Sequence, residues 1–257
     1  MDNKTLVQQQ FGANAAAYAT SSVHAKGASL ARLVELTQPR GDWRALDIAT
    51  GAGHTAFAFA PHIARVTASD LTPEMLTVAE NLAKDKGLTN VDFKQADAEN
   101  LPFDGATFDL VTCRIAPHHF PDIDRFVREG ARVLKPGGVL AIVDNIVPSD
   151  PEAADYINAF EKFRDLSHGR CLPAEEWANS YEKAGLALIH AEEAKKAMNF
   201  EAWADNMNVS VEGRETLRGM LHDAPTSVLA FLAPEFEGVN TITFYLSEGI
   251  FIGKKET

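Results

Sequence analysis

The stretch that most constrains the fold is residues 45–56, which read Ala-Leu-Asp-Ile-Ala-Thr-Gly-Ala-Gly-His-Thr-Ala. Residues 45–49 are apolar apart from one aspartate, which predicts a short buried strand. Gly51 and Gly53 predict a tight turn, because glycine adopts positive φ angles and lets a ligand approach the backbone. A helix is expected to begin near His54 or Thr55, and its unpaired N–H groups can bind an oxygen-rich ligand. Strand, turn and helix together predict a cradle the size of a nucleotide.

Strands and helices alternate from residue 41 to residue 147. Periodicity and turn residues predict further strands over 65–70, 91–95, 108–113 and 139–143, with helices over 72–87 and 122–134. This alternation is typical of an α/β fold with a mostly parallel sheet, in which ligands bind beyond the carboxyl ends of the strands.

The segments on either side of residues 41–147 have a different rhythm. Residues 1–37 are expected to be helical. After residue 147 the pattern predicts helices over 149–166 and 173–184, a strand over 186–197, short helices over 200–233 and a last strand over 241–252. No stretch rich in Gly, Ser or Pro separates these parts, so we expect residues 1–257 to form one domain.

Composition argues against several classes of protein. The net charge of −12, with no run of Lys and Arg, argues against a nucleic-acid partner. Cys113 and Cys171 form neither a disulfide framework nor a Cys-x-x-Cys pair, and no metal is expected. No stretch approaches the roughly 20 apolar residues of a membrane span, and the polar N-terminus lacks a signal-peptide pattern. We therefore expect a cytoplasmic protein without a membrane span.

Acidic residues stand near the ends of three predicted strands. Asp70 ends the second strand, where a carboxylate can accept two hydrogen bonds from a ribose diol. Asp97 follows the third strand and can accept a hydrogen bond from an adenine amino group, with the Ala98 N–H as a donor to the ring. Asp47, just before the glycines, would repel a pyrophosphate and suits a ligand with an ammonium group. The combination favours an adenosine-type cofactor.

Five stretches form a combined pattern, at residues 46–53, 70, 97–103, 108–111 and 134–138. Together they resemble the class I S-adenosylmethionine-dependent methyltransferases, and within them the small-molecule branch related to the ubiquinone/menaquinone biosynthesis methyltransferases. The resemblance implies a Rossmann-like sheet of seven strands, mostly parallel, with an antiparallel last strand and helices on both faces. It also implies an N-terminal helical lid over 1–37, a cofactor-binding core over 41–147, and a helical insertion after the fifth strand that places 148–257 on the acceptor side.

The same resemblance implies S-adenosyl-L-methionine as the cofactor and S-adenosyl-L-homocysteine as its product. The reaction would move a methyl group to an oxygen, nitrogen or carbon atom of a small-molecule acceptor by in-line displacement, which depends mainly on alignment. Carried over by position, it implies cofactor contacts from Asp47 and the turn at 51–53 to the methionine part, from Asp70 to the ribose, and from Leu71, Asp97 and Ala98 to the adenine. The remaining cofactor candidates are Tyr18, Ala49, Met75, Arg114 and Ile115.

Two adjacent histidines, His118 and His119, follow the fourth predicted strand at the mouth of the expected site. They are the catalytic candidates, as a base or as a pair that orients the acceptor, because a base must reach the acceptor and titrate near neutrality. The alternative is a loop that packs its imidazoles against the cofactor or caps the next helix.

Two other functions remain open on the sequence alone. An NAD-dependent oxidoreductase would use the same glycine turn, although Asp47 and the Lys-Pro-Gly-Gly stretch at 135–138 argue against it. A non-catalytic cofactor-binding protein would bind the same cofactor without transferring a methyl group. A homodimer is one option for its assembly.

Overall fold

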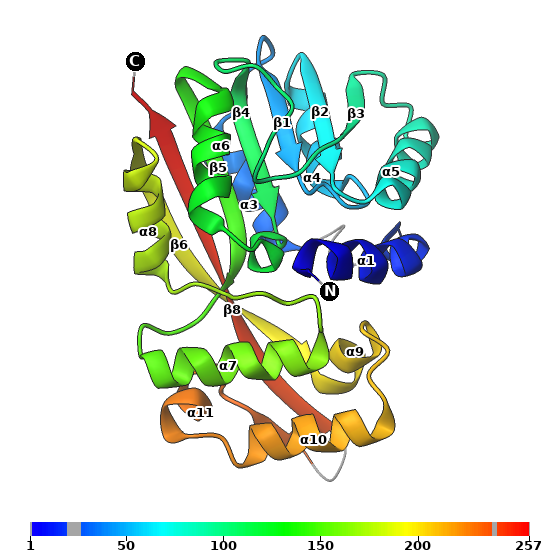
Figure 1. The fold of residues 1–257 in the computed structure, drawn as a ribbon, viewed down its shortest axis with the longest axis vertical. Coiled ribbons are helices and arrows are strands. Elements are labelled where there is room, and N and C mark those ends of the chain that lie inside the picture. The colour runs from blue at the N-terminus through cyan, green and yellow to red at the C-terminus, as the bar shows by residue number, and fades with distance from the viewer. Residues whose placement is uncertain (1, 20–26, 238–240, 257) are drawn as a thin grey trace.

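The computed structural model describes residues 2–19, 27–237 and 241–256 (Figure 1). The helices are α1 (Asn3–Ala19), α3 (Ala28–Thr37), α4 (His54–Phe59), α5 (Pro73–Asp85), α6 (Ile123–Val133), α7 (Pro151–Arg164), α8 (Ala174–Lys183), α9 (Phe200–Asp205), α10 (Val211–His222) and α11 (Thr226–Leu232). The strands are β1 (Arg44–Ile48), β2 (Arg65–Asp70), β3 (Val91–Gln95), β4 (Phe108–Arg114), β5 (Leu134–Ile146), β6 (Leu186–Asn199), β7 (Glu235–Glu237) and β8 (Thr241–Lys255). None of the helices in these segments is long and apolar enough to cross a membrane.

The strands form one mixed sheet in the order β3-β2-β1-β4-β5-β8-β6. The first five strands in this order pair in parallel, and β8 runs antiparallel to both β5 and β6. The mostly parallel sheet with an antiparallel last strand is therefore confirmed. The structure adds an eighth strand that the sequence analysis did not predict, since β7 is a three-residue exposed strand that pairs only with β8.

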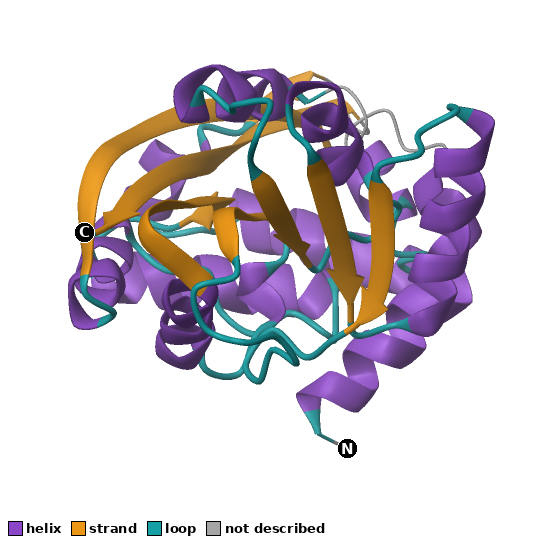
Figure 2. Ribbon diagram, turned by 90° about the horizontal axis from the view of Figure 1, so that it is seen from above, coloured by secondary structure: helices purple, strands orange, loops and turns teal. Residues whose placement is uncertain are grey.

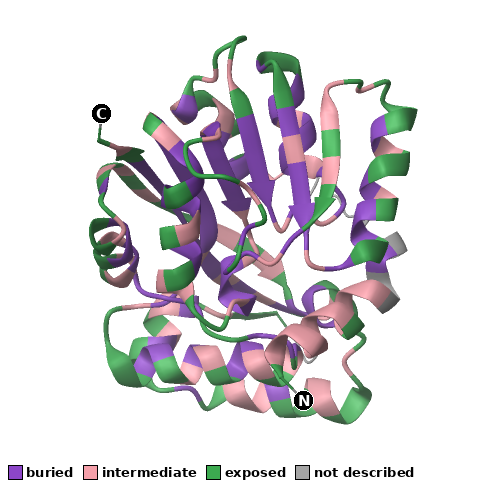
Figure 3. Cartoon of the chain, turned by 45° about the horizontal axis from the view of Figure 1, so that its top comes forward, coloured by how far each residue is buried: buried purple, intermediate pink, exposed green. Residues whose placement is uncertain are grey.

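Helices cover both faces of the sheet because its strands are apolar on both sides (Figures 2 and 3). On one face α3, α4 and α5 pack over Ala45, Leu110 and Ala141. On the other face α6 and α8 pack over Leu46 and Val111, the residues that follow in the same strands. Alternation along each strand thus builds two cores, one on each side.

A third core lies beyond the sheet's central strands and is formed by α7, α9, α10 and α11 with the first half of β8. Phe160 and Trp203 stack there at a centroid distance of 4.8 Å, and Phe244 of β8 packs edge-on against both rings. In Figure 1 these helices lie below the carboxyl ends of the strands, and α1 lies above them, just below α5. This arrangement places helical segments opposite the edge of the sheet where ligands bind in such folds.

Candidate functional site

The turn after β1 is held together by the buried carboxylate of Asp47. Asp47 Oδ2 accepts hydrogen bonds from Thr50 Oγ1 (2.5 Å) and from the Ala56 N–H (3.2 Å), and Oδ1 accepts one from Thr112 Oγ1 (2.7 Å). Burial raises the pKa of this carboxyl to about 6, against the opposing effect of the bonds from Thr50 and Thr112. Asp47 thus stabilises the turn, and the expectation that it faces the cofactor is not met, since its side chain is 1% exposed and lies outside the cavity wall.

Gly53, like Asp47, belongs to the turn but does not line the cavity. Its φ of +89° lies in the left-handed region, and a Cβ at this position would overlap the ring of Phe57. Gly51, with a φ of +55°, has open space where a Cβ would project and does line the cavity. Gly53 therefore shapes the turn, whereas Gly51 exposes its backbone to the cavity.

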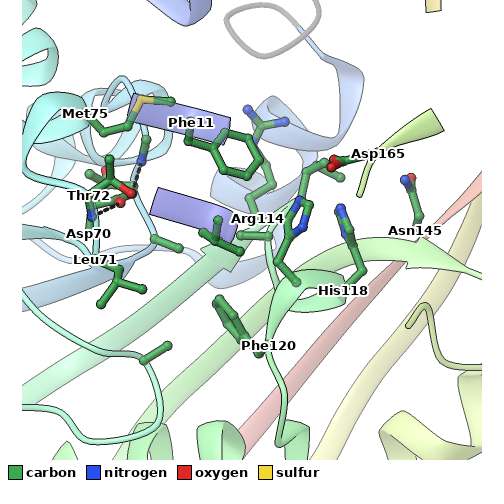
Figure 4. Close-up of a pocket in the computed structure, with 18 of the residues that line it drawn as sticks. Phe11, Asp70, Leu71, Thr72, Met75, Arg114, His118, Phe120, Asn145 and Asp165 are labelled. Carbon is green, nitrogen blue, oxygen red and sulfur yellow. Dashed lines mark hydrogen bonds between the residues drawn. The ribbon is translucent and has the colours of Figure 1, made fainter. Parts of the chain in front are cut away.

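A single cavity collects most of the predicted site residues at the carboxyl ends of the parallel strands (Figure 4). Eleven of them line it: Ala49, Gly51, Asp70, Leu71, Met75, Asp97, Ala98, Arg114, Ile115, His118 and His119. The side chain of Tyr18 lies outside the described residues, so its role stays a prediction. Figure 4 shows Asp70, Leu71, Thr72 and Met75 toward one end, and His118, Asn145 and Asp165 toward the other.

Asp70 is fixed in place by two backbone groups. Its Oδ2 accepts a hydrogen bond from the Gly51 N–H and its Oδ1 accepts one from the Thr72 N–H, both at 2.9 Å. Each carboxylate oxygen has a second lone pair, so the group can still accept from a ligand hydroxyl. Burial raises the pKa of Asp70, and the bonds from Thr72 and Gly51 oppose that effect. This carboxylate fits a ribose diol.

The N-terminal helix α1 closes the cavity next to Asp97. A helical lid was expected here, but the contacts that hold it were not predicted. Lys4 Nζ lies 2.6 Å from Asp97 Oδ2 and 2.6 Å from Glu99 Oε2. Gln8 Nε2 donates to the backbone carbonyl of Leu71 at 3.1 Å. Phe11 enters the cavity wall and packs edge-on against the ring of His119. Helix α1 therefore contacts both halves of the site.

Two non-glycine residues of the cavity wall have left-handed backbone angles. Ala49 and Ile115 both have a φ of +52°. Such an angle is strained for a β-branched residue, and strain of this kind gathers at functional sites. The Ile115 N–H donates to the carbonyl of Val143 at 2.8 Å, which holds the chain in this conformation as it leaves β4.

Arg114, the last residue of β4, lies between the two ends of the cavity in Figure 4. Its Nε donates to Thr55 Oγ1 at 3.1 Å. Burial lowers the pKa of its guanidinium, and the nearby carboxylates of Glu248 and Asp47 partly offset that effect. A buried cation at this place can bind a carboxylate of a ligand.

The far end of the cavity was poorly predicted. It is lined by Phe120 and by residues of β5, α7, β6, α9, β8 and the loops next to them, namely Asn145, Arg164, Asp165, Lys196, Met198, Trp203, Asn206, Met207 and Leu246. Asn145 could have been found, because it lies near the end of β5 and polar residues after the other strands were singled out. The others come from segments far apart in sequence, which no local pattern brings together.

The two catalytic candidates have different surroundings. His118 Nδ1 lies 2.6 Å from Asp144 Oδ1, and His119 Nδ1 lies 3.1 Å from the carbonyl of Ser167. Burial lowers the pKa of His118, but the charge and hydrogen bond of Asp144 outweigh it, so the net direction is upward. Burial, together with the charge of His118, lowers the pKa of His119 to about 3. Asp144 is a residue that the sequence analysis missed.

Comparison with known proteins agrees with this geometry. Residues 46–142 match a family described as "Methyltransferase domain". An uncharacterised methyltransferase of Bacillus subtilis, YcgJ, is 39% identical over 193 residues, which is 75% of this chain and 76% of that protein. A ubiquinone/menaquinone biosynthesis C-methyltransferase of Pseudomonas entomophila is 31% identical over 179 residues, covering 68% of this chain and 70% of its own length.

Among solved structures, a putative methyltransferase from Bacillus halodurans superposes with a TM-score of 0.87 at 38% identity, covering 90% of this chain and 100% of its own. Three observations agree with one another: the family motifs, the share of each chain over which these relatives match, and the position of the cavity over the glycine turn. The chain belongs to the class I S-adenosylmethionine-dependent methyltransferases.

Proposed function

We propose that the cavity binds S-adenosylmethionine over the glycine turn and transfers its methyl group to a small molecule held at the far end. The observation that carries this proposal is the continuity of the cavity. Its wall includes Gly51, Asp70 and Asp97 at one end and His118 and Trp203 at the other. One continuous cavity can therefore place a cofactor and an acceptor next to each other, which is what methyl transfer requires.

The cofactor end fits a cationic nucleoside in three respects. Asp70 keeps lone pairs for the ribose hydroxyls, and Leu71 and Met75 offer apolar surface beside it. Asp97 and Ala98 also line the cavity, and we assign the adenine edge to them. Arg114 supplies a cation for the carboxylate of the methionine part. When bound, the cofactor supplies an activated methyl group on a sulfonium; the chain contributes binding, orientation and exclusion of water.

The acceptor end favours a small molecule rather than a polymer. Its wall mixes apolar side chains, such as Met198, Trp203 and Leu246, with a few polar ones. Such a lining is typical of small-molecule pockets. Helix α1 and the third core enclose it, and the net charge of −12 gives no attraction for nucleic acid. A cytoplasmic location and a homodimer remain predictions from the sequence.

Calorimetric titration of the purified protein with S-adenosylmethionine tests this proposal. We expect binding by the wild type and a loss of roughly tenfold or more in affinity for Asp70→Asn. The amide has one accepting oxygen where the carboxylate has two, so its NH₂ group would face one of the two backbone N–H groups and an acceptor for the ribose diol would be lost. Asp92→Asn is the matched control, since Asp92 lies in the neighbouring strand β3 and pairs with Arg65 away from the cavity. A folded wild type that does not bind the cofactor would refute the proposal.

The acceptor itself can be identified by transfer of a labelled methyl group to a metabolite extract, followed by mass analysis of the product. A labelled small molecule would support the acceptor class. Label recovered only on nucleic acid or protein would contradict it.

A further inference from the structure

One carboxylate holds His118 at two points. Asp144 Oδ2 accepts a hydrogen bond from the His118 backbone N–H at 2.7 Å, and Asp144 Oδ1 lies 2.6 Å from the ring Nδ1. Asp144 belongs to β5 and is 1% exposed, so the ring is tied to a buried residue of an inner strand of the sheet. A carboxylate only accepts hydrogen bonds, which places the hydrogen of the neutral ring on Nδ1 and leaves the lone pair on Nε2.

The Nε2 atom of His118 is available to a ligand. Within the described part of the chain it has no hydrogen-bond partner, and His118 lines the cavity. The backbone of the same loop is pinned as well, because the carbonyl of His118 accepts hydrogen bonds from the N–H groups of Gly169 and Arg170. Both the backbone and the ring of His118 are therefore preorganised.

Two other imidazoles lie next to His118 and differ from it in their partners. The ring centroid of His119 is 4.2 Å away and that of His168 is 5.4 Å away. His119 Nδ1 faces a backbone carbonyl, and His168 Nε2 lies 3.0 Å from Asn158 Oδ1. Burial lowers the pKa of His168 to about 2, as it lowers that of His119 to about 3. Both rings stay neutral near pH 7 and are weak bases.

The charged groups around His118 favour its protonated form on balance. Asp144 from β5 touches it, and Glu161 and Asp165, in and directly after α7, act on it at longer range. Arg164, from the same helix, lowers the pKa of the neighbouring His119 and His168, and its guanidinium is paired with Glu161 at 3.0 Å. A proton delivered to His118 would therefore be stabilised where it arrives.

We propose that Asp144 is a positioning residue that makes His118 Nε2 the proton acceptor of the reaction. It follows that the methyl acceptor is an acid at the reacting atom, carrying a hydroxyl or an acidic C–H. This inference rests on the proposed function and specifies its acceptor class. As the acceptor's O or C atom forms its bond to the methyl carbon, the C–S bond breaks and its electron pair stays on sulfur. The acceptor proton moves to Nε2, and the products are the methylated acceptor, the thioether and an imidazolium.

Asp144→Asn separates this role from a merely structural one. The amide offers one acceptor oxygen where the carboxylate offers two, and both the backbone N–H and Nδ1–H of His118 need an acceptor. With the oxygen on the backbone N–H, the amide NH₂ faces Nδ1 and forces the hydrogen onto Nε2. The ring then keeps its place but can no longer accept the proton.

Nitrogen NMR of histidine-labelled protein reports the tautomer and titration of each ring, with His118→Gln used for assignment. In the wild type we expect a neutral Nδ1–H ring that titrates above the ordinary histidine value of about 6.5. In Asp144→Asn we expect the Nε2–H tautomer and a lower pKa. Asp165→Asn is the matched control, because this buried carboxylate bonds Ser167 rather than a ring of the cluster and should leave the tautomer unchanged.

The acceptor class is tested with chosen probes and labelled S-adenosylmethionine. We expect transfer to β-naphthol or acetylacetone, which carry an ionisable proton, and not to dimethylaniline, which carries none. Asp144→Asn should lower kcat by roughly 10²-fold or more while the Kd for the cofactor stays within about twofold. Asp92→Asn should match the wild type in both.

An Nδ1–H ring in Asp144→Asn, or a wild-type His118 that titrates below the ordinary value, overturns the role of Asp144 whether or not a probe is methylated. Transfer to dimethylaniline alone overturns the acceptor class. Failure of the wild type to bind the cofactor would instead refute the proposed function, and the titration would still decide the role of Asp144.

Discussion

Gly51 and Gly53 share one turn but resist substitution for different reasons. Both have left-handed φ angles, which cost a non-glycine residue about 1–2 kcal/mol. At Gly53 an added Cβ would also overlap the Phe57 ring, and overpacking costs about 1–3 kcal/mol more. We expect Gly53→Ala to lower the free energy of unfolding clearly more than Gly51→Ala. Chemical denaturation measures both, and equal losses would contradict the packing argument.

The raised pKa of Asp47 predicts a pH dependence of stability. A carboxyl whose pKa is about 6 when folded and 3.8 when unfolded contributes stability below pH 3.8, and this contribution is lost as the pH rises through 6. Because one pKa unit corresponds to about 1.4 kcal/mol, the loss is at most about 3 kcal/mol. Asp47→Asn does not titrate, so its stability relative to the wild type should improve by up to that amount between pH 4 and pH 7.

Asp92→Asn serves as the control for that measurement. The hydrogen bond from Arg65 lowers the pKa of Asp92, so its contribution is present above the unfolded value and lost only as the pH falls below it. Its profile should follow the wild type from pH 4 to pH 7. If the stability of Asp47→Asn also follows that of the wild type over this pH range, the pH dependence does not come from Asp47.

Residues near strand ends were the most predictable part of the site. Asp70, Asp97 and Arg114 line the cavity because parallel strands end at one edge, and that rule needs only the strand positions. Asp47 shows its limit: the pattern located the residue, but whether its carboxylate points to a ligand or to Thr50 and Thr112 depends on packing. Asp144 was missed because its role exists only through its contact with His118.

At the scale of elements, the contacts of α1 predict which side chain holds this N-terminal helix in place. Lys4 joins it to Asp97 and Glu99, and Gln8 joins it to the loop after β2. Because an exposed helix end without such a tie frays readily, we expect Lys4→Gln to increase hydrogen exchange of the amides at 3–12 by several-fold. Mass spectrometry measures this, with Lys86→Gln, exposed just after α5, as the control. Unchanged exchange at 3–12 would show that Lys4 does not hold the helix.

Apart from β7, the elements after residue 147 were predicted in type but not in arrangement. Caps and apolar spacing indicate helices there, and Asp150 and Ser210 do cap α7 and α10. Their packing around Phe160, Trp203 and Phe244 depends on long-range contacts between separate segments. The acceptor end of the cavity is built from these segments, so its shape could not be derived from local patterns.

At the scale of the whole molecule, β8 is the element that joins the cores. Phe244 lies in the core beside α7 and α9, Phe251 in the core under α6 and α8, and Ile250 and Ile252 on the opposite face of the sheet. A single strand of 15 residues thus takes part in all three. A chain whose cores share one strand should lose them together, which bears on the expectation of a single domain.

Replacing one buried side chain in each half of β8 by alanine tests this coupling. Phe244→Ala and Phe251→Ala remove rings that are 0% and 1% exposed, so each is expected to cost about 3–5 kcal/mol. If the molecule unfolds as one unit, either change shifts the same single calorimetric transition to lower temperature. Phe236→Ala removes a ring that is 46% exposed and should shift it little. Two separated transitions in either core variant would mean that the helices after residue 147 unfold independently of the cofactor-binding sheet, and that the chain has two domains.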